Sequence, residues 1–290
     1  MLLERLMNQT GLSDSQLERF AATASKRYKV YQIPKRTGGF RTIEHPAKEI
    51  KAIQRWLNRV LIRRLPLHEC ATAYSKGSSI RGNAEKHVRY PFTLRVDFEE
   101  FFPSFFFEHV TYFLTESSEA RIIGLSPKDI CFASRIFCRL DALTIGAPSS
   151  PHLTNAMMYD FDSELSRWCV QREFVYSRYA DDMFISSFRP NLLNSALEKI
   201  VELAQGYRFG ALRINTEKTA FLSRRYHRSI TGIVVTPTGE LSIGRARKVR
   251  LKKEIYEFQR SRLPRDQWER VRGMLAFVND VEPTFRETLI

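Results

Sequence analysis

The sequence predicts an α+β fold, and three stretches of the 290-residue chain carry that prediction. Residues 174–187 contain two runs rich in β-branched and aromatic side chains on either side of an Asp-Asp pair, which is the pattern of a β-hairpin. Residues 94–97 form a short apolar strand that ends in an aspartate. Residues 50–61 instead repeat apolar side chains at helical spacing, which predicts an amphipathic helix.

The composition predicts a globular, intracellular protein. Hydrophobic residues make up 43% and aromatic residues 12% of the chain, which excludes a disordered protein. There is no run of 18 uncharged apolar residues, so we expect no membrane-spanning helix and no membrane partner. The first residues lack the basic-then-apolar layout of a signal peptide. The cysteines have no Cys-x-x-Cys spacing, which favours reduced, mostly buried thiols in a cytoplasmic protein over a zinc site.

The charge distribution favours a nucleic-acid partner. The chain carries a net charge of +14. Residues 26–64 contain 12 basic residues against two acidic ones, and residues 245–272 contain 11 against four. Lysine and arginine neutralise the phosphate backbone, and here two basic blocks flank the segment that holds the Asp-Asp pair. This layout is typical of an enzyme that acts on nucleic acid.

Three aspartates are the candidate catalytic and metal-binding residues. Asp181 and Asp182 lie at the predicted hairpin tip, at the edge of a core, where two adjacent carboxylates need a counter-cation. Mg²⁺ suits them because it prefers carboxylate oxygens and keeps positions open for water and phosphates. Asp97, at the end of its own strand, would complete a site for two Mg²⁺ ions about 3.5–4 Å apart, which is the arrangement used for phosphoryl transfer.

Four motifs resemble those of reverse transcriptases. Residues 179–182, Tyr-Ala-Asp-Asp, are similar to the Tyr-x-Asp-Asp motif of these enzymes, and residues 97–102 are similar to their first catalytic motif. Residues 83–87, Asn-Ala-Glu-Lys-His, match the Asn-Ala-x-x-His element of the bacterial retron type, and residues 230–232, Ile-Thr-Gly, resemble its Val-Thr-Gly element. The matches extend from about residue 29 to about residue 275.

The resemblance implies a right-hand polymerase. Residues 1–90 would form N-terminal helices and fingers, 91–238 a palm with an antiparallel sheet packed by helices, and 239–290 a short thumb. Residues 108–145 would be interrupted helices that belong partly to the fingers. A thumb of this kind holds an A-form duplex by its backbone and its shallow minor groove.

The N-terminal residues 1–25 are expected to form one or two short helices, with an N-cap at Ser13. Residues 29–34 and 40–43 alternate like two strands joined by a turn through Thr37, Gly38 and Gly39. Pro46 is then expected to open the amphipathic helix.

By resemblance, the first hairpin belongs to the fingers, whose basic residues hold the incoming triphosphate. Arg41 is the first candidate for that contact and Lys35 the second. Contact with the nucleic-acid backbone, without a catalytic role, is the alternative for both. Asn83 and His87 would lie near the template RNA or organise a loop that does.

Phe102 follows Asp97 by five residues, and the resemblance implies that it packs beneath the sugar of the incoming nucleotide and excludes a 2′-hydroxyl. Gly146 and Ala147 belong to a turn of small residues that would let a nucleotide approach the backbone closely before a long helix at about residues 151–170. Ile145 stands where the family commonly has glutamine.

Lys218 lies between two strand-like runs at residues 211–214 and 220–223, and it resembles the lysine that protonates the pyrophosphate leaving group in related polymerases. A solvent-facing turn lysine is the alternative. Thr231 and Gly232 lie in a predicted buried strand at residues 230–235, in the region where the family grips the primer end. Arg272 belongs to a segment that resembles a thumb helix and would contact nucleic acid.

The resemblance implies RNA-templated DNA synthesis, in which a primer hydroxyl attacks a deoxynucleoside triphosphate. Asp97 and Asp181 would bind two Mg²⁺, and Asp182 would support the site. Similarity to retron enzymes further implies a dedicated structured non-coding RNA as template and an RNA 2′-hydroxyl as primer, which give a branched RNA–DNA product. It also implies antiphage defence with an effector protein in a bacterial cytoplasm.

Two alternatives stay open on the sequence. One is another polymerase class. The chain lacks the length expected for the maturase and endonuclease segments of a group II intron enzyme, and Phe102 as a sugar gate argues against an RNA-dependent RNA polymerase. The other is a nucleic-acid-bound scaffold that restrains a toxic effector protein, which the complete set of three aspartates disfavours.

Overall fold

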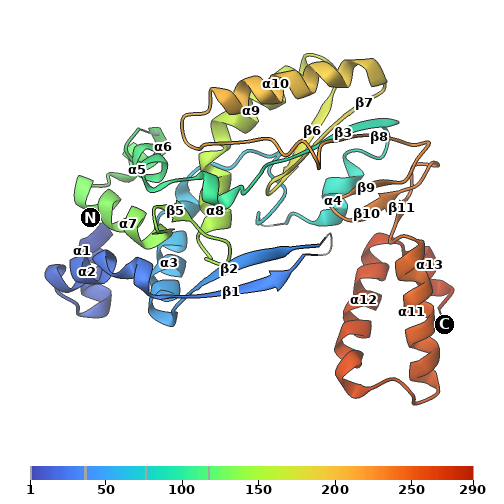
Figure 1. Ribbon diagram of the computed structural model, residues 1–290, viewed down its shortest axis with the longest axis horizontal. Coiled ribbons are helices and arrows are strands. Elements are labelled where there is room, and N and C mark those ends of the chain that lie inside the picture. The colour runs from blue at the N-terminus through green and yellow to red at the C-terminus, as the bar shows by residue number, and fades with distance from the viewer. Residues whose placement is uncertain (1, 36–37, 76, 117, 290) are drawn as a thin grey trace.

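The α+β fold predicted from the sequence is present in the computed structural model, which describes residues 2–35, 38–75, 77–116 and 118–289 (Figure 1). The expected hairpin turn falls partly on Arg36 and Thr37, which lie outside the described residues. The helices are α1 (Leu2–Thr10), α2 (Asp14–Ala22), α3 (Lys48–Val60), α4 (Ile80–Glu85), α5 (Phe107–Glu116), α6 (Ser118–Ile123), α7 (Pro127–Phe137), α8 (Ser150–Met157), α9 (Tyr159–Val170), α10 (Leu193–Gln205), α11 (Arg245–Gln259), α12 (Trp268–Val281) and α13 (Pro283–Glu287).

Two sheets and two hairpins contain the strands. They are β1 (Tyr28–Pro34), β2 (Phe40–Pro46), β3 (Phe92–Asp97), β4 (Cys138–Arg139), β5 (Ala142–Leu143), β6 (Val175–Tyr179), β7 (Asp182–Ser187), β8 (Ala220–Ser223), β9 (Arg228–Ile230), β10 (Ile233–Val235) and β11 (Leu241–Ser242). The central sheet has the order β6-β7-β3-β8 with every neighbouring pair antiparallel. A second, three-stranded sheet has the order β11-β10-β9.

The central sheet separates two hydrophobic cores. Helices α9 and α10 cover one face, and α4 and the second sheet lie on the other (Figure 1). Successive strand residues point to opposite faces. Met183 and Ile185 therefore join the core on the side of α9 and α10, whereas Phe184 packs with Ile230 and Ile233 of the second sheet. Because each face is buried, the register of β7 is strongly specified.

The β1–β2 hairpin and the C-terminal helices extend away from the central sheet. The hairpin is exposed along most of its length and runs from the N-terminal helices toward the side of the molecule where α11 and α12 lie (Figure 1). At the N-terminus, Ser13 caps α2 in a capping box with Gln16, as the sequence predicts.

Four local predictions need correction. Pro46 ends β2 rather than opening the helix, and α3 begins at Lys48. The helix expected over 151–170 is two helices, because Met158, with ψ of 0°, interrupts the regular helix between α8 and α9. The strand expected over 230–235 is the β9–β10 hairpin. Of the strand expected over 211–214, only an isolated bridge at Ile214 is present.

In the part of the chain that the structure describes, no helix is both long and apolar enough to cross a bilayer. The four cysteines are free, as the sequence predicts; Cys70, Cys138 and Cys169 are buried and Cys131 is half-buried.

Candidate active site

The predicted aspartates meet at one end of the central sheet. Asp97, the last residue of β3, pairs in register with Asp182, the first residue of β7. Asp181 is the second residue of the two-residue turn that joins β6 to β7, directly before Asp182. Asp97 is only 3% exposed, and the other two are half-buried. Strand ends and a tight turn, rather than a long loop, therefore hold the three carboxylates.

The turn has a strained first position. Tyr179 and Asp182 form the last pair of the β6–β7 ladder, so Ala180 and Asp181 are the two turn residues. Ala180 has a φ of 57°, in the left-handed region that suits two-residue hairpin turns but disfavours a residue with a side chain. Such strain persists only where the surroundings fix it.

Two basic side chains form ion pairs with Asp97 and Asp182. Lys218 Nζ donates to Asp97 Oδ1 at 2.7 Å, and Arg95 donates to Asp182 Oδ1 from Nε at 2.9 Å and from Nη2 at 2.7 Å. An asparagine turn orients the lysine: Asn215 N donates to the Asp97 carbonyl at 2.8 Å, and Asn215 Oδ1 accepts from Lys218 N at 3.2 Å. The structure thus brings Lys218 to the carboxylates, and its expected role as proton donor to pyrophosphate stays a prediction.

The site has more negative charge than these cations offset. Burial first, and then the charges of Asp97 and Asp182, raise the pKa of Asp181 to about 6. Burial also raises the pKa of Asp182, although Arg95 opposes that shift. Among the described residues, Lys218 pairs with Asp97 and Arg95 with Asp182, and no ion pair involves Asp181, which is the condition a bound cation relieves.

The donor set fits a divalent metal. Carboxylate oxygens at a partly buried position are the ligands that Mg²⁺ prefers. Within the described ranges, no group of three or more histidine, cysteine or acidic side chains already converges around one point. Two of the three carboxylates are instead engaged by Lys218 and Arg95.

Phe102 and the small-residue turn lie in distinct settings. Phe102 begins a short 3₁₀ helix (Phe102–Ser104), is half-buried, and packs its ring 5.5 Å from that of Phe101. At Gly146, φ is 117° and a Cβ would lie 3.1 Å from the Glu44 carbonyl oxygen. The close neighbour of Gly146 in this structure is therefore the backbone of strand β2. Ala147 is 3% exposed.

The fingers candidates are exposed on the β1–β2 hairpin. Arg41 lies on β2 opposite Ile33, and Lys35 directly follows β1. Burial, and then Tyr179 and Asp181, raise the pKa of Tyr74, whereas Arg41 lowers it. Arg41 and Asp181 thus both act electrostatically on one tyrosine. The sequence analysis did not single out Tyr74, whose φ of 59° is unusual for a bulky residue.

Asn83 and His87 do not lie on the surface. Both are 0% exposed. Asn83 Oδ1 accepts from Thr72 Oγ1 at 2.9 Å. His87 bonds through Nδ1 to Ser186 Oγ at 2.8 Å and through Nε2 to Ser177 Oγ at 2.7 Å. Side chains without exposed surface cannot touch RNA, so direct template contact does not fit these positions. The other interpretation, that they organise a neighbouring segment, stays a prediction.

The remaining nucleic-acid candidates lie outside the carboxylate cluster. Thr231 and Gly232 form the β9–β10 turn with φ of 47° and 81°, and Thr231 Oγ1 donates to the Ile80 carbonyl at 3.1 Å. Arg272 lies on α12 with 82% of its side chain exposed, 3.6 Å from Glu269.

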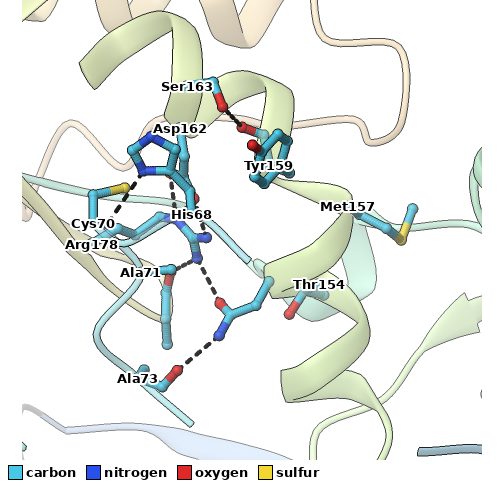
Figure 2. Close-up of polar contacts among 12 residues, drawn as sticks. His68, Cys70, Ala71, Ala73, Thr154, Met157, Tyr159, Asp162, Ser163 and Arg178 are labelled. Atoms are coloured by element: carbon cyan, nitrogen blue, oxygen red, sulfur yellow. Dashed lines mark hydrogen bonds and ion pairs between the residues drawn. The ribbon is translucent and has the colours of Figure 1, made fainter. Parts of the chain in front are cut away.

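Sequence reasoning missed two arginines beside the aspartates. Arg95 precedes Asp97 by two residues and so shares its strand face, a signal that was available. Arg178 on β6 is fully buried and pairs with Asp162 of α9 (Figure 2). This pairing could not be predicted from the sequence, because it depends on how α9 packs on the sheet.

A central antiparallel sheet with paired aspartates at its end, a basic hairpin and a helical C-terminus defines a polymerase, and the comparisons agree. The family described as "Reverse transcriptase (RNA-dependent DNA polymerase)" matches residues 33–235. The protein is therefore an enzyme, an RNA-directed DNA polymerase of a family that uses a divalent metal, an RNA template and deoxynucleoside triphosphates.

Bacterial relatives identify the branch of that family. The chain is 34% identical over 268 residues to the retron Ec83 reverse transcriptase of Escherichia coli, covering 90% of this chain and 85% of that one. It is 29% identical to the retron Ec86 reverse transcriptase of the same species, covering 99% and 87%. The retron Mx162 enzyme of Myxococcus xanthus is 30% identical, covering 97% and 64%. The chain belongs to the retron reverse transcriptases.

Solved structures agree on the right-hand polymerase fold. Telomerase from Candida albicans has a TM-score of 0.54 at 13% identity, covering 95% of this chain and 60% of that chain. The foamy viral protease-reverse transcriptase has a TM-score of 0.52 at 16% identity, covering 87% and 36%. The chain thus spans less than two thirds of either protein, and the likeness concerns the fold.

Proposed function

We propose that this retron reverse transcriptase copies a dedicated structured non-coding RNA into single-stranded DNA, primed by an RNA 2′-hydroxyl, to give a branched RNA–DNA hybrid. The observation that supports the active site is the pairing of Asp97 with Asp182 in adjacent strands, with Asp181 in the turn between β6 and β7. The similarity to bacterial retron enzymes along nearly the whole chain supports the template and the priming chemistry.

Asp97 and Asp181 would hold two Mg²⁺ ions, and Asp182 would support them. The bound ions supply charge neutralisation for the phosphates and a lowered pKa for the primer hydroxyl. Arg95 already occupies Asp182 Oδ1 with two nitrogen atoms, which favours a supporting role for that carboxylate. Asp97, which accepts one bond from Lys218, and Asp181 would then supply the main oxygen ligands.

Lys218 is the candidate proton donor to the pyrophosphate leaving group. Its ammonium is half-exposed and reaches Asp97, so it lies at the edge of the carboxylate cluster with protons to donate. The ion pair with Asp97 would hold the Lys218 ammonium at the site, and a bound nucleoside triphosphate would offer this ammonium a new acceptor. A positioned donor of this kind typically contributes about 10²–10⁴-fold to a rate.

The nucleotide would lie between the aspartates and the β1–β2 hairpin. Arg41, with Lys35 beside it, would hold the triphosphate from the hairpin, since both are exposed and Arg41 shares Tyr74 as an electrostatic neighbour with Asp181. Phe102 would lie beneath the sugar and exclude a 2′-hydroxyl. Gly146, which is exposed, would line the approach to the same position, and the buried Ala147 would support it from within.

The RNA and its DNA product would contact the basic surfaces. Thr231 and Gly232 would meet the primer strand, and Arg272, from the exposed side of α12, would contact a backbone phosphate. Asn83 and His87 would act indirectly. His87 bonds serines of both β6 and β7, so it braces the hairpin that carries Asp181.

The enzyme would act in the bacterial cytoplasm, where RNA and deoxynucleoside triphosphates are available. We further propose that its branched product serves antiphage defence together with an effector protein. Membership of the same branch as the retron relatives supports this step.

Nucleic acid that co-purifies with the protein tests the proposal. The gene is expressed with its native flanking DNA, and the bound nucleic acid is treated with RNase, DNase or a debranching enzyme. We expect DNA that is shortened by debranching and absent from an Asp181→Asn/Asp182→Asn variant. RNA alone from both proteins would contradict DNA synthesis on that RNA and favour a binding scaffold.

A further inference from the structure

A fully buried arginine lies one residue before the end of the strand that leads into the turn with Asp181. Arg178 is the next-to-last residue of β6, and neither its side chain nor that of Asp162 on α9 has any exposed surface. The guanidinium donates from Nε to Asp162 Oδ1 at 2.9 Å and from Nη2 to Oδ2 at 2.5 Å (Figure 2). A buried charge is costly unless it is well paired, and this pair uses both carboxylate oxygens.

The remaining nitrogen of this guanidinium reaches the turn. Arg178 Nη1 donates to the Ala180 carbonyl at 3.0 Å and to Asn155 Oδ1 at 3.0 Å, and Asn155 Nδ2 donates to the Ala73 carbonyl at 2.8 Å. Helices α8 and α9 thus hold the guanidinium in one orientation. The Ala180 carbonyl belongs to the peptide that joins Ala180 to Asp181, so the bond fixes the peptide directly before the aspartate.

That peptide has an alternative orientation. In a two-residue hairpin turn, rotation of the central peptide interconverts the two primed turn types. Ala180 already has a φ of 57°, which disfavours a residue with a side chain, so the turn is not held by the preferences of its own residues. A rotated peptide would turn the backbone of Asp181 and direct its carboxylate away from Asp97.

We propose that Arg178 is a positioning residue that fixes the Ala180–Asp181 peptide and thereby holds the Asp181 carboxylate where it can bind metal. The inference rests on the proposed role of Asp181 as a metal ligand. It also explains why the residue is arginine. A lysine has a single nitrogen atom, which cannot span Asp162 and the Ala180 carbonyl as the planar fork does.

Metal binding by the 290-residue, nucleic-acid-free protein tests this role. Mn²⁺ is titrated and its free fraction is measured by electron paramagnetic resonance for the wild type, Arg178→Lys and Asp181→Asn. The matched control is Arg228→Lys, which alters another fully buried arginine that donates to the Tyr90 carbonyl and to Thr93 Oγ1 on β3. Affinity for an RNA–primer duplex and the melting temperature are measured in parallel.

We expect Arg178→Lys to raise the Mn²⁺ dissociation constant by roughly 10- to 100-fold, the usual loss when a group that orients a metal ligand is removed. Its kcat for nucleotide addition should fall with little change in duplex affinity. Arg228→Lys should lower the melting temperature but leave Mn²⁺ binding within about twofold of the wild type, since it does not touch the turn.

Two outcomes would overturn parts of this account separately. If Asp181→Asn weakens Mn²⁺ binding but Arg178→Lys does not, the positioning role fails and the metal site stands. If Asp181→Asn itself leaves Mn²⁺ binding unchanged, the proposed metal site fails and the positioning role fails with it.

Two further variants keep the test decisive if Arg178→Lys does not fold. Arg178→Met/Asp162→Leu replaces the ion pair with apolar side chains, an exchange that proteins often tolerate, but it leaves no donor for the Ala180 carbonyl. It should fold and still lose Mn²⁺ affinity. Adding Ala180→Gly should restore part of that affinity, because glycine adopts positive φ without strain. Wild-type affinity in the double variant would contradict the proposal.

Discussion

Asp97 and Asp182 are direct partners in the β3–β7 ladder, yet their carboxylates bind different cations, Lys218 and Arg95. Strand register therefore fixes the separation of the two aspartates. A slip of one residue would move Asp182 to the face covered by α9 and α10, and the buried side chains on both faces oppose such a slip. In the described part of the chain, no basic side chain forms an ion pair with Asp181, which lies in the turn.

Replacing Asp181 should stabilise the protein but lower its activity, because its carboxylate adds negative charge to the site. Asp181→Asn should raise the free energy of unfolding of the metal-free protein by about 1 kcal/mol at neutral pH. The raised pKa of Asp181 reflects the burial of its charge and its repulsion by Asp97 and Asp182, and neutral asparagine has neither cost. DNA synthesis should fall by about 10²-fold or more. Urea unfolding in a chelator and primer extension measure the two effects.

Asp160→Asn is the control for this prediction, because Asp160 is an exposed aspartate of α9 on the opposite side of the sheet. It should change neither quantity. A loss of stability in Asp181→Asn would contradict the view that this carboxylate is unfavourable without metal.

Lys218 should affect chemistry more than binding. Lys218→Gln removes the proposed proton donor and should lower kcat by about 10²-fold, with the affinity for an RNA–primer duplex unchanged. Lys218→Arg should recover less than wild-type activity, because a guanidinium hardly releases a proton. Pre-steady-state nucleotide addition measures this step, and Lys199→Gln on α10, whose lysine pairs with Glu164 and Glu202, serves as the control.

Phe102 should set the preference for deoxynucleotides. Phe102→Ala should lower the ratio of deoxy- to ribonucleotide incorporation by about 10- to 100-fold, because the shortened side chain leaves room for a 2′-hydroxyl. Incorporation of each nucleotide opposite the same RNA template base gives the ratio. Phe106→Ala is a suitable control, since Phe106 is 40% exposed and stacks on His109. Equal ratios in both variants would remove Phe102 from this role.

The three aspartates could be predicted from the sequence because the chemistry requires carboxylates within short motifs. The strands around Asp181 could be predicted too, since β-branched and aromatic runs on both sides of a tight turn have few other solutions. The break at Met158 could not, because neither glycine nor proline marks it. Local pattern, in short, predicts an element better than it predicts where that element bends.

Partners across the fold were beyond sequence reasoning. Arg178 finds Asp162 only when α9 packs on the sheet. Asn83 and His87 lie in a polar stretch that resembles an exposed loop, yet both are buried with hydrogen bonds to other elements. Hydropathy does not distinguish a polar side chain in water from one whose hydrogen bonds are satisfied inside the protein.

His87 should make stability depend on pH. Burial, and then Lys86 and Arg228, lower its pKa to about 3 in the folded protein, whereas the unfolded imidazole titrates near 6.5. Between these values the unfolded state binds one more proton, so the free energy of unfolding falls as pH falls, by up to about 1.4 kcal/mol per pH unit. At pH 5 this amounts to about 2 kcal/mol.

Removing the imidazole isolates this contribution. His87→Gln should be less stable than the wild type at pH 7.5, and the difference should narrow between pH 6.5 and 5, as measured by urea unfolding. His227→Gln removes an exposed histidine and should leave the pH dependence unchanged. Parallel pH profiles for His87→Gln and the wild type would mean that His87 is not held neutral.

Arg272 should act through one phosphate. Its side chain is 82% exposed on α12 and only weakly paired with Glu269, so it is free to meet a nucleic-acid backbone. Arg272→Ala should weaken binding to RNA–DNA duplexes of any sequence by a similar factor. The slope of log affinity against log salt concentration should become less negative by about 1, because one phosphate contact releases about one counter-ion. Fluorescence anisotropy at several salt concentrations measures this slope.

The control is Arg172→Ala, which follows α9 on the opposite side of the central sheet and should leave the slope unchanged. A full loss of binding in Arg272→Ala would instead indicate that α12 is disrupted, and an unchanged slope would place the duplex elsewhere on the protein.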